Sequence, residues 1–268
     1  MQLLPSLCKG DKVGVWTASD PIVNTPASQW VERGAKTLKQ MGFTVVNGAT
    51  LNTQTKYTAG TAELRWKDFS SFIKDPDIKL ILTALGGENA HQILPLIDFE
   101  LIARNPKIIM GYSDPTVFLN PITQFSKIPT FYGHHLASFD PEWPWFGDYD
   151  RDCFERIFIK AEHPFEVPPS NNRECWREGV SEGRLVGVFN RITGMILGKF
   201  YHSESPQNYD QTLKAIILDI TSDFKFPILK TVDFGHFSHF CPLPLGVMCR
   251  IDATQKLFKI LDPVIQKT

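Results

Sequence analysis

The sequence predicts an α/β fold: a parallel sheet layered between helices, followed by a smaller β/α domain. Short apolar runs alternate with longer amphipathic segments through the first half of the chain, which is typical of a parallel sheet covered by helices. Two turns, at Gly86-Gly87 and at residues 111–114, directly follow apolar runs. We therefore expect both turns at the carboxyl edge of the sheet, where sites gather in such folds.

The expected elements of the first half follow from apolar spacing and from helix stop signals. Gly42 and the pair Asp75-Pro76 each follow an amphipathic segment, as is common just past a helix C-terminus. Strands are expected over residues 13–18, 43–46, 78–83, 107–110 and 128–132, and helices over 29–41, 62–74, 90–97 and 115–126.

The second half changes composition. Residues 139–182 are rich in Pro, Trp, Gly and acidic residues, and we interpret them as a surface excursion followed by a linker. This predicts an N-terminal domain over residues 1–165 and a C-terminal domain over residues 166–268. Apolar runs resume after residue 183, and residues 245–261 have the pattern of a hairpin.

Charge and composition limit the function classes. Lys and Arg total 28 and Asp and Glu total 29, a net charge of −1 that gives no long-range attraction for nucleic acid or anionic membranes. The five cysteines show no C-x-x-C spacing, so neither a zinc knuckle nor a redox pair is indicated, and free thiols fit a reducing compartment. Without a signal-peptide pattern or an apolar stretch of about 18 residues, a cytoplasmic location is expected.

Ser113 is a candidate nucleophile in the run Gly111-Tyr112-Ser113-Asp114. It lies between an apolar run and an expected helix, and a serine on such a turn is held exposed beside the N–H groups of a helix N-terminus. Those groups can stabilise an oxyanion. The run departs from the G-x-S-x-G elbow because Pro115 follows Asp114, and a simple helix cap is the alternative.

Gly86-Gly87 is the second candidate feature. It is either a plain strand-to-helix turn or a loop whose N–H faces the substrate carbonyl. Glu88 next to it either touches polar substrate groups or caps the following helix.

Seven histidines compete for the role of base. His236 and His239 follow an expected strand, and no spacing argument chooses between them. The pair His134-His135 raises the question of a metal, but adjacent positions rarely chelate one ion, and no acidic partner has motif spacing. We expect neither a metal nor a cofactor.

Several segments, in order along nearly the whole chain, resemble the LD-carboxypeptidase serine peptidase family, which includes the microcin C immunity proteins. They include KGDKVGVWTASDP, NPKIIMGYSDPTVFLN, TFYGHHLAS, EGRLVG and DFGHFSHFCPLPLGVMCRIDA. The resemblance implies a Ser-His-Glu hydrolase that needs no metal and cleaves the amide between an L- and a D-centre in murein peptides. It also implies a layered N-terminal domain, a smaller swivelling C-terminal domain and a homodimer.

The resemblance also assigns roles to residues. Ser113 corresponds to the nucleophile, and the backbone N–H groups of Gly87 and Asp114 correspond to the oxyanion donors. The family base lies in a G-H pair ten residues before the glycine of the L-P-L-G run, which selects His236 over His239.

The chain departs from the family pattern after EGRLVG. Val188 follows Gly187 at once, so the segment that carries the family's catalytic Glu is absent, and the C-terminal domain is expected to be shortened there. Either the deletion is genuine, as we expect, or the sequence omits residues of the protein. Available carboxylates are Glu182, Asp219 and Asp233, and none is assigned.

Two functions stay open. The first is a serine carboxypeptidase-like hydrolase acting on murein-type peptides or peptide-nucleotide antibiotics. The second is a catalytically impaired homologue acting as a binding or remnant protein, because disabling a triad acid costs about 10⁴ in rate.

Overall fold

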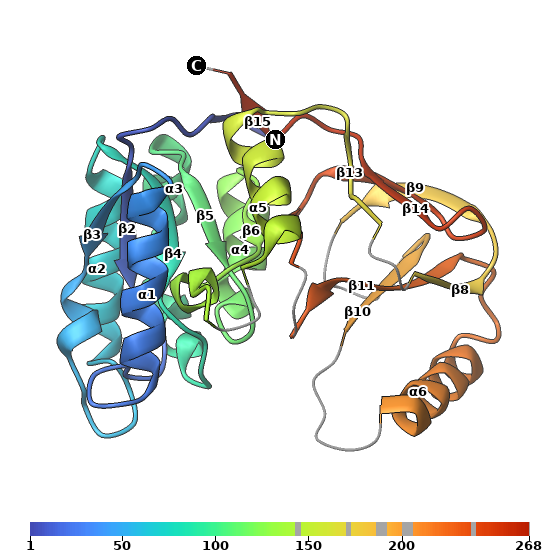
Figure 1. Cartoon of the computed structure of the whole chain (residues 1–268), viewed down its shortest axis with the longest axis horizontal. Helices are drawn as coiled ribbons and strands as arrows, with labels where there is room; N and C mark the ends of the chain where they lie inside the picture. The colour runs from blue at the N-terminus through green and yellow to red at the C-terminus, as the bar shows by residue number, and fades with distance from the viewer. Residues whose placement is uncertain (143–145, 170–172, 186–191, 200–205, 237–239, 268) are drawn as a thin grey trace.

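Five strands from the first half of the chain and one from the second half form the central sheet (Figure 1). The structure, a computed structural model, describes residues 1–142, 146–169, 173–185, 192–199, 206–236 and 240–267. The sheet has the order β12-β6-β5-β4-β2-β3, and all neighbouring pairs are parallel except β12 with β6. Its strands are β2 (Lys12–Trp16), β3 (Thr44–Asn47), β4 (Ile78–Thr83), β5 (Ile108–Gly111), β6 (Phe131–Tyr132) and β12 (Leu243–Pro244).

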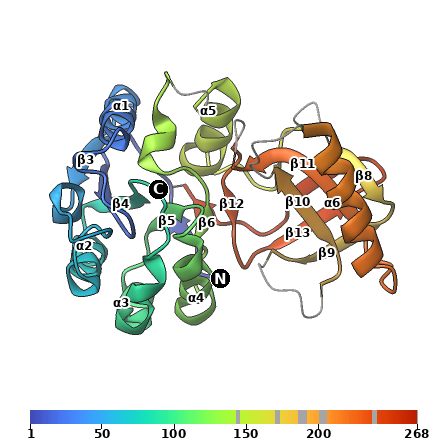
Figure 2. The ribbon, with the colours of Figure 1, turned by 90° about the horizontal axis from the view of Figure 1, so that it is seen from below.

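Helices cover both faces of this sheet, as expected. Figure 2 shows α1 and α5 on one face, and α2, α3 and α4 on the other. Thr61 caps α2 by accepting a hydrogen bond from the Leu64 amide, and the helix ends before Asp75-Pro76. The helices are α1 (Ala27–Gln40), α2 (Ala62–Lys74), α3 (Phe99–Arg104), α4 (Thr116–Ser126) and α5 (Asp148–Phe154), with single 3₁₀ turns η1 (Ala49–Asn52) and η3 (Leu136–Phe139).

Two expected elements differ in detail. The helix expected over residues 90–97 is the 3₁₀ segment η2 (Ala90–Leu96), and Pro95 within it lacks the N–H that a regular α-helix needs. The strand expected over residues 128–132 shortens to the two residues of β6, and Pro129 before it cannot donate to a ladder.

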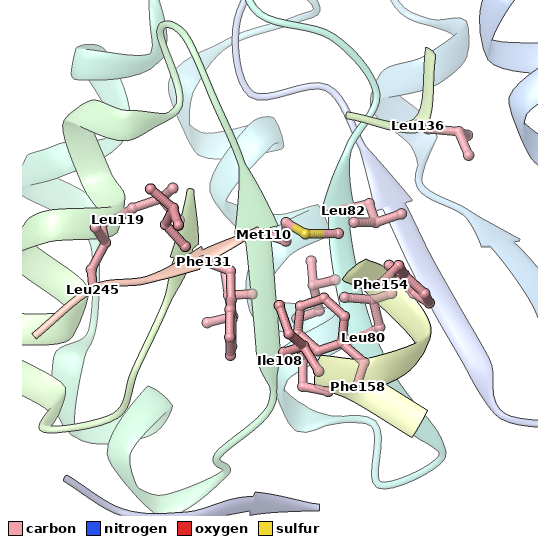
Figure 3. Close-up of a cluster of buried hydrophobic side chains, with 14 of the residues drawn as sticks. Leu80, Leu82, Ile108, Met110, Leu119, Phe131, Leu136, Phe154, Phe158 and Leu245 are labelled. Atoms are coloured by element: carbon pink, nitrogen blue, oxygen red, sulfur yellow. The ribbon is translucent and has the colours of Figure 1, made fainter. Parts of the chain in front are cut away.

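The core of this half lies between the sheet and its helices (Figure 3). β4, β5 and β6 each contribute apolar side chains that are almost fully buried, as strands covered on both faces do. The aromatic ring of Phe131 meets that of Phe158 at a centroid distance of 4.7 Å. The labelled members of the cluster include Leu80, Leu82, Ile108, Met110, Phe131, Phe154 and Phe158.

The interpretation of residues 139–182 as a surface excursion and linker is wrong. This stretch contains α5, the π-helical turn η4 (Glu155–Ile159) and three strands, β7 (Phe165–Glu166), β8 (Glu174–Arg177) and β9 (Val180–Arg184). Phe154 and Phe158 are fully buried against the first sheet. The stretch therefore supplies core, because its few large aromatic residues outweigh its polar composition.

The second half forms two further sheets. β10 (Met195–Lys199) and β11 (Ile228–Gly235) are parallel and are connected through α6 (Pro206–Ile220), while β8 pairs antiparallel with β11. A four-stranded antiparallel sheet has the order β7-β14-β13-β9. Its strands β13 (Met248–Asp252) and β14 (Leu257–Ile260) confirm the hairpin expected over residues 245–261. The predicted fold class, a layered parallel-sheet domain plus a smaller β/α domain, is confirmed.

The two halves are joined by strand pairing as well as by the chain. β12 returns from the second half to the edge of the first sheet, and β1 (Leu4–Pro5) pairs with β15 (Ile265–Gln266) near both termini (Figure 1). A domain boundary at residues 165/166 stays a prediction. The junction Gly187–Val188 lies outside the described residues, so the expected deletion also stays a prediction.

Candidate active site

Ser113 lies on a tight turn between β5 and α4. Its φ is 60°, in the left-handed region, and its side chain is half-buried. Such a conformation costs a non-glycine residue about 1–3 kcal/mol and persists where the surrounding structure fixes it, often at active sites. The turn is closed by a 3.0 Å hydrogen bond from the Thr116 amide to the Ser113 carbonyl. Ser113 thus lies at the strand-to-helix turn where the sequence predicted it.

The loop after β4 approaches Ser113 through Gly86. A Cβ built on Gly86 would lie 3.2 Å from Ser113 Oγ, so only glycine leaves the space beside the hydroxyl open. Gly87 follows with a φ of 148°, and its amide and that of Asp114 donate to no acceptor among the described residues. These two unclaimed donors, each adjacent in sequence to Gly86 or Ser113, have the chemistry of an oxyanion hole.

Residues after β2 hold this loop in place. The Asn89 amide donates to Ser19 Oγ at 2.7 Å, and the Glu88 amide donates to Asp20 Oδ1 at 3.3 Å. Glu88 itself is exposed. Ser19 and Asp20 were not predicted as site residues, although they belong to the matched segment KGDKVGVWTASDP.

Arg65 of α2 is the buried charge behind the loop. Its guanidinium donates to the Ala18 carbonyl at 2.8 Å and to the Asn89 carbonyl at 3.0 Å. Burial lowers the pKa of Arg65, and the nearby carboxylate of Asp114 opposes that shift. Asp114 in turn accepts the Ala90 amide at 2.8 Å, which ties the nucleophile turn to the loop. The one sequence signal for Arg65 is its helical spacing to Phe69 and Phe72, which places it on their face of α2 although an arginine on a helix is usually solvated.

Replacing Gly87 by alanine is expected to lower kcat/KM about 10²-fold, the loss typical of one oxyanion donor. A Cβ at Gly87 would lie 2.3 Å from Asp20 Oδ1 and 2.4 Å from Ser19 Oγ, so the loop must move and carry the Gly87 amide with it. Gly10→Ala is the matched control, because Gly10 also has a positive φ, 95°, but no atom lies within 4 Å of its Cβ position. Equal losses in steady-state assays of both variants would contradict this role.

His236 follows β11 directly and reaches the same region. Its amide donates to the Lys199 carbonyl at 3.0 Å, and its ring meets the ring of Tyr112 edge-on at a centroid distance of 5.5 Å. Tyr112 precedes Ser113, so the second half of the chain brings His236 to the nucleophile turn. The competing His239 lies outside the described residues.

None of the candidate acids contacts His236 within the part of the chain that the structure describes. Asp233 is fully buried in an ion pair with Arg173 at 2.6 Å, and Glu182 pairs with Arg250 at 3.6 Å on the surface. Asp219 is exposed on α6.

His134 and His135 face different partners. His134 Nε2 lies 3.1 Å from Asp150 Oδ1, whereas His135 Nδ1 lies 2.6 Å from Thr83 Oγ1. Two imidazoles bonded in this way do not converge on one ion. The described residues contain no group of three or more His, Cys, Asp or Glu side chains arranged to hold a metal.

A search of the described helices for a membrane-spanning segment, by length and hydropathy, finds none.

Family sequence models match both halves of the chain. The model of the LD-carboxypeptidase N-terminal domain matches residues 13–133, and that of the LD-carboxypeptidase C-terminal domain matches residues 174–251. Together these two stretches span more than half of the sequence. The chain belongs to the LD-carboxypeptidase family.

Known members of the LD-carboxypeptidase family extend this result. The microcin C7 self-immunity protein MccF of Escherichia coli is 24% identical over 331 aligned positions, covering 97% of this chain and 96% of that protein. A probable murein peptide carboxypeptidase of Bacillus subtilis is 31% identical, covering 68% of this chain and 55% of that protein. The MccF alignment has more positions than the 268 residues of this chain, so parts of MccF face gaps here.

Solved structures agree with the fold. MccF in complex with aspartyl sulfamoyl adenosine superposes with a TM-score of 0.83 at 24% identity, covering 99% of this chain and 100% of that chain. An MccF-like protein from Streptococcus pneumoniae in complex with AMP superposes with a TM-score of 0.74 at 18% identity, covering 95% and 99% of the two chains. The two-domain LD-carboxypeptidase fold is therefore shared across distant sequences.

Proposed function

We propose that the protein is a metal-independent serine carboxypeptidase-like hydrolase that cleaves an amide bond in murein-type L,D-peptides or peptide-nucleotide antibiotics. One observation carries the proposal: Ser113 sits in a left-handed turn beside Gly86, with the unclaimed amides of Gly87 and Asp114 next to it in the chain. Acyl transfer needs an accessible nucleophile and hydrogen-bond donors for the oxyanion, and the surroundings of Ser113 offer both.

The proposed reaction proceeds through an acyl-enzyme. Ser113 Oγ attacks the amide carbonyl carbon while His236 accepts the hydroxyl proton, and the amides of Gly87 and Asp114 donate to the oxyanion. His236 then gives the proton to the leaving amine as the carbon–nitrogen bond breaks. Water attacks the ester with His236 again as base, which releases the acid product and restores Ser113.

The substrate class comes from the relatives. One is described as a murein peptide carboxypeptidase, and MccF was solved with aspartyl sulfamoyl adenosine, an aminoacyl-nucleotide analogue. Both a murein peptide and a peptide-nucleotide present an amide or acyl linkage beside a charged group. A homodimer is expected from the family resemblance, and sedimentation of the purified protein would test it.

The alternative is a catalytically impaired homologue that binds such ligands without turnover. Two observations favour it: no Asp or Glu among the described residues pairs with His236, and the MccF alignment requires gaps in this chain. In serine proteases, disabling the acid that orients the catalytic histidine lowers kcat about 10⁴-fold.

The deciding assay incubates the protein separately with a murein tetrapeptide and with an aspartyl-nucleotide conjugate, with and without a chelator. Release of the terminal D-amino acid or of aspartate, unaffected by the chelator and lost in Ser113→Ala, is the expected result. Tight binding by calorimetry without any product would instead establish the alternative. Product release that the chelator abolishes would contradict the metal-independent mechanism.

The pH dependence of the reaction is expected to follow His236. Desolvation lowers the pKa of His236 below its ordinary value of 6.5. Because a base works only when unprotonated, the neutral form then persists below pH 6.5, and kcat/KM should fall only at lower pH. A kcat/KM profile whose acid limb has its midpoint above 6.5 would exclude His236 as the base.

A further inference from the structure

His135 lies beneath the nucleophile turn and plays no part in the mechanism above. Its side chain is 1% exposed, and its ring packs on that of Tyr112 at a centroid distance of 4.1 Å. It follows β6, yet its Nδ1 reaches Thr83 Oγ1 at the end of β4, 2.6 Å away. Since β5 lies between β4 and β6, the imidazole crosses the strand end from which Ser113 emerges.

The other ring nitrogen of His135 borders the same space beside Gly86 as the Ser113 hydroxyl. His135 Nε2 is buried and has no hydrogen-bond partner among the described residues. A Cβ built on Gly86 would lie 3.4 Å from this nitrogen and 3.2 Å from Ser113 Oγ, so both atoms border the space that Gly86 leaves empty. A buried polar atom without a partner is costly and rare in native proteins, so such an atom beside a nucleophile indicates a partner in the working enzyme.

The hydrogen bond to Thr83 fixes where the His135 proton lies. The Thr83 side chain is buried, and within the described part of the chain its hydroxyl has His135 Nδ1 as its one partner. We assign Thr83 as the donor, because an unprotonated Nδ1 gives its hydroxyl proton an acceptor, whereas a protonated Nδ1 would leave that proton without one. Burial, followed by the neighbouring His236 and His134, lowers the pKa of His135 to about 3, so the ring is neutral at physiological pH and carries its proton on Nε2.

We propose that His135 is a positioning residue whose Nε2–H donates a hydrogen bond to Ser113 Oγ across Gly86. The inference rests on the proposed function and deepens it. A hydroxyl has one proton and two lone pairs, so Ser113 Oγ can accept from His135 and still donate to His236. The bond directs the Ser113 proton to the base, and His135 keeps its own proton throughout the reaction. Thr83 sets the tautomer.

The hydrogen bond is tested by nitrogen NMR of protein labelled with ¹⁵N-histidine, with His135→Phe used to assign the His135 signals. Two results are expected: a protonated Nε2 and unprotonated Nδ1 near neutral pH, and a shift of the Nε2–H signal in Ser113→Ala. In Thr83→Val, which keeps the shape but removes the hydroxyl, the other tautomer should become populated. A protonated Nδ1 in the wild type, or an Nε2–H signal unchanged by Ser113→Ala, would overturn the proposal.

The consequence for reactivity is tested with a fluorophosphonate probe. His135→Phe is expected to lower the maximal rate of Ser113 labelling roughly tenfold, the worth of one hydrogen bond, with little change in the half-saturating probe concentration. His91→Phe, at an exposed position, is the matched control and should match the wild type. An unchanged maximal rate in a folded His135→Phe variant would also overturn the proposal. If the wild type is not labelled at all, the proposed function fails, while the NMR result still decides the hydrogen bond.

Discussion

Replacing Ser113 by alanine is expected to lower kcat/KM on the cleaved substrate by at least about 10⁴-fold, because the nucleophile of a triad cannot be replaced by binding and oxyanion stabilisation alone. Ser113 is half-buried and makes no side-chain hydrogen bond among the described residues, so the loss of its hydroxyl leaves the fold unharmed. Steady-state kinetics measures the first effect, and the melting temperature checks the second.

The matched control is Ser28→Ala. Ser28 is exposed, and within the described ranges its hydroxyl bonds to the nearby Thr25 carbonyl alone, at 2.7 Å. Full activity in this control, beside loss in Ser113→Ala, assigns the effect to the nucleophile. Retention of more than a tenth of the activity in Ser113→Ala would mean that another group attacks the amide.

The largest expected effect on stability concerns the buried ion pair of Arg173 and Asp233. Arg173→Met should lower the free energy of unfolding by about 3–5 kcal/mol, because it leaves the Asp233 charge buried without its partner. The Arg173 guanidinium also donates to the carbonyls of Val167 and Lys256, each at 2.8 Å. Urea unfolding followed by circular dichroism measures the change.

The same pair anchors the segment that carries His236. The carbonyl of Asp233 accepts the Cys241 amide at 2.7 Å, so this residue holds both ends of the crossing from β11 towards β12. We therefore expect Arg173→Met to lose activity as well. Lys12→Met is the control, since its pair with Asp77 is largely exposed and screened by solvent, so that its loss should change stability little. Equal destabilisation by the two variants would refute the role assigned to the buried pair.

Local sequence signals were sufficient to predict the parallel sheet and the turn that carries Ser113. Apolar runs bounded by Gly and Pro mark β2, β4 and β5, and a serine after such a run lies at the sheet edge whatever the rest of the chain does. Because β4 and β5 are adjacent, Gly86 and Ser113 meet there.

Features that depend on packing between distant segments could not be predicted from the sequence. Residues 139–182 have the composition of a linker, yet Phe154 and Phe158 complete the core. Their burial depends on the sheet, whose strands are distant in sequence. Arg65 shares the buried face of α2 with Phe69 and Phe72, yet its charge argues for a solvated side chain, and only the loop at Asn89 shows what pairs it there. His135 differs from His134 by no local feature, because its role depends on Thr83, a residue two strands away in the sheet.

Fluorophosphonate labelling of the intact protein followed by peptide mapping is the direct test of whether Ser113 is an activated nucleophile. The probe reacts with a serine only where a base and an oxyanion hole activate it. We expect a single adduct on Ser113, absent in Ser113→Ala and retained in Ser28→Ala. An adduct on any other serine, or no adduct on the folded wild-type protein, would contradict the assignment of Ser113 as an activated nucleophile.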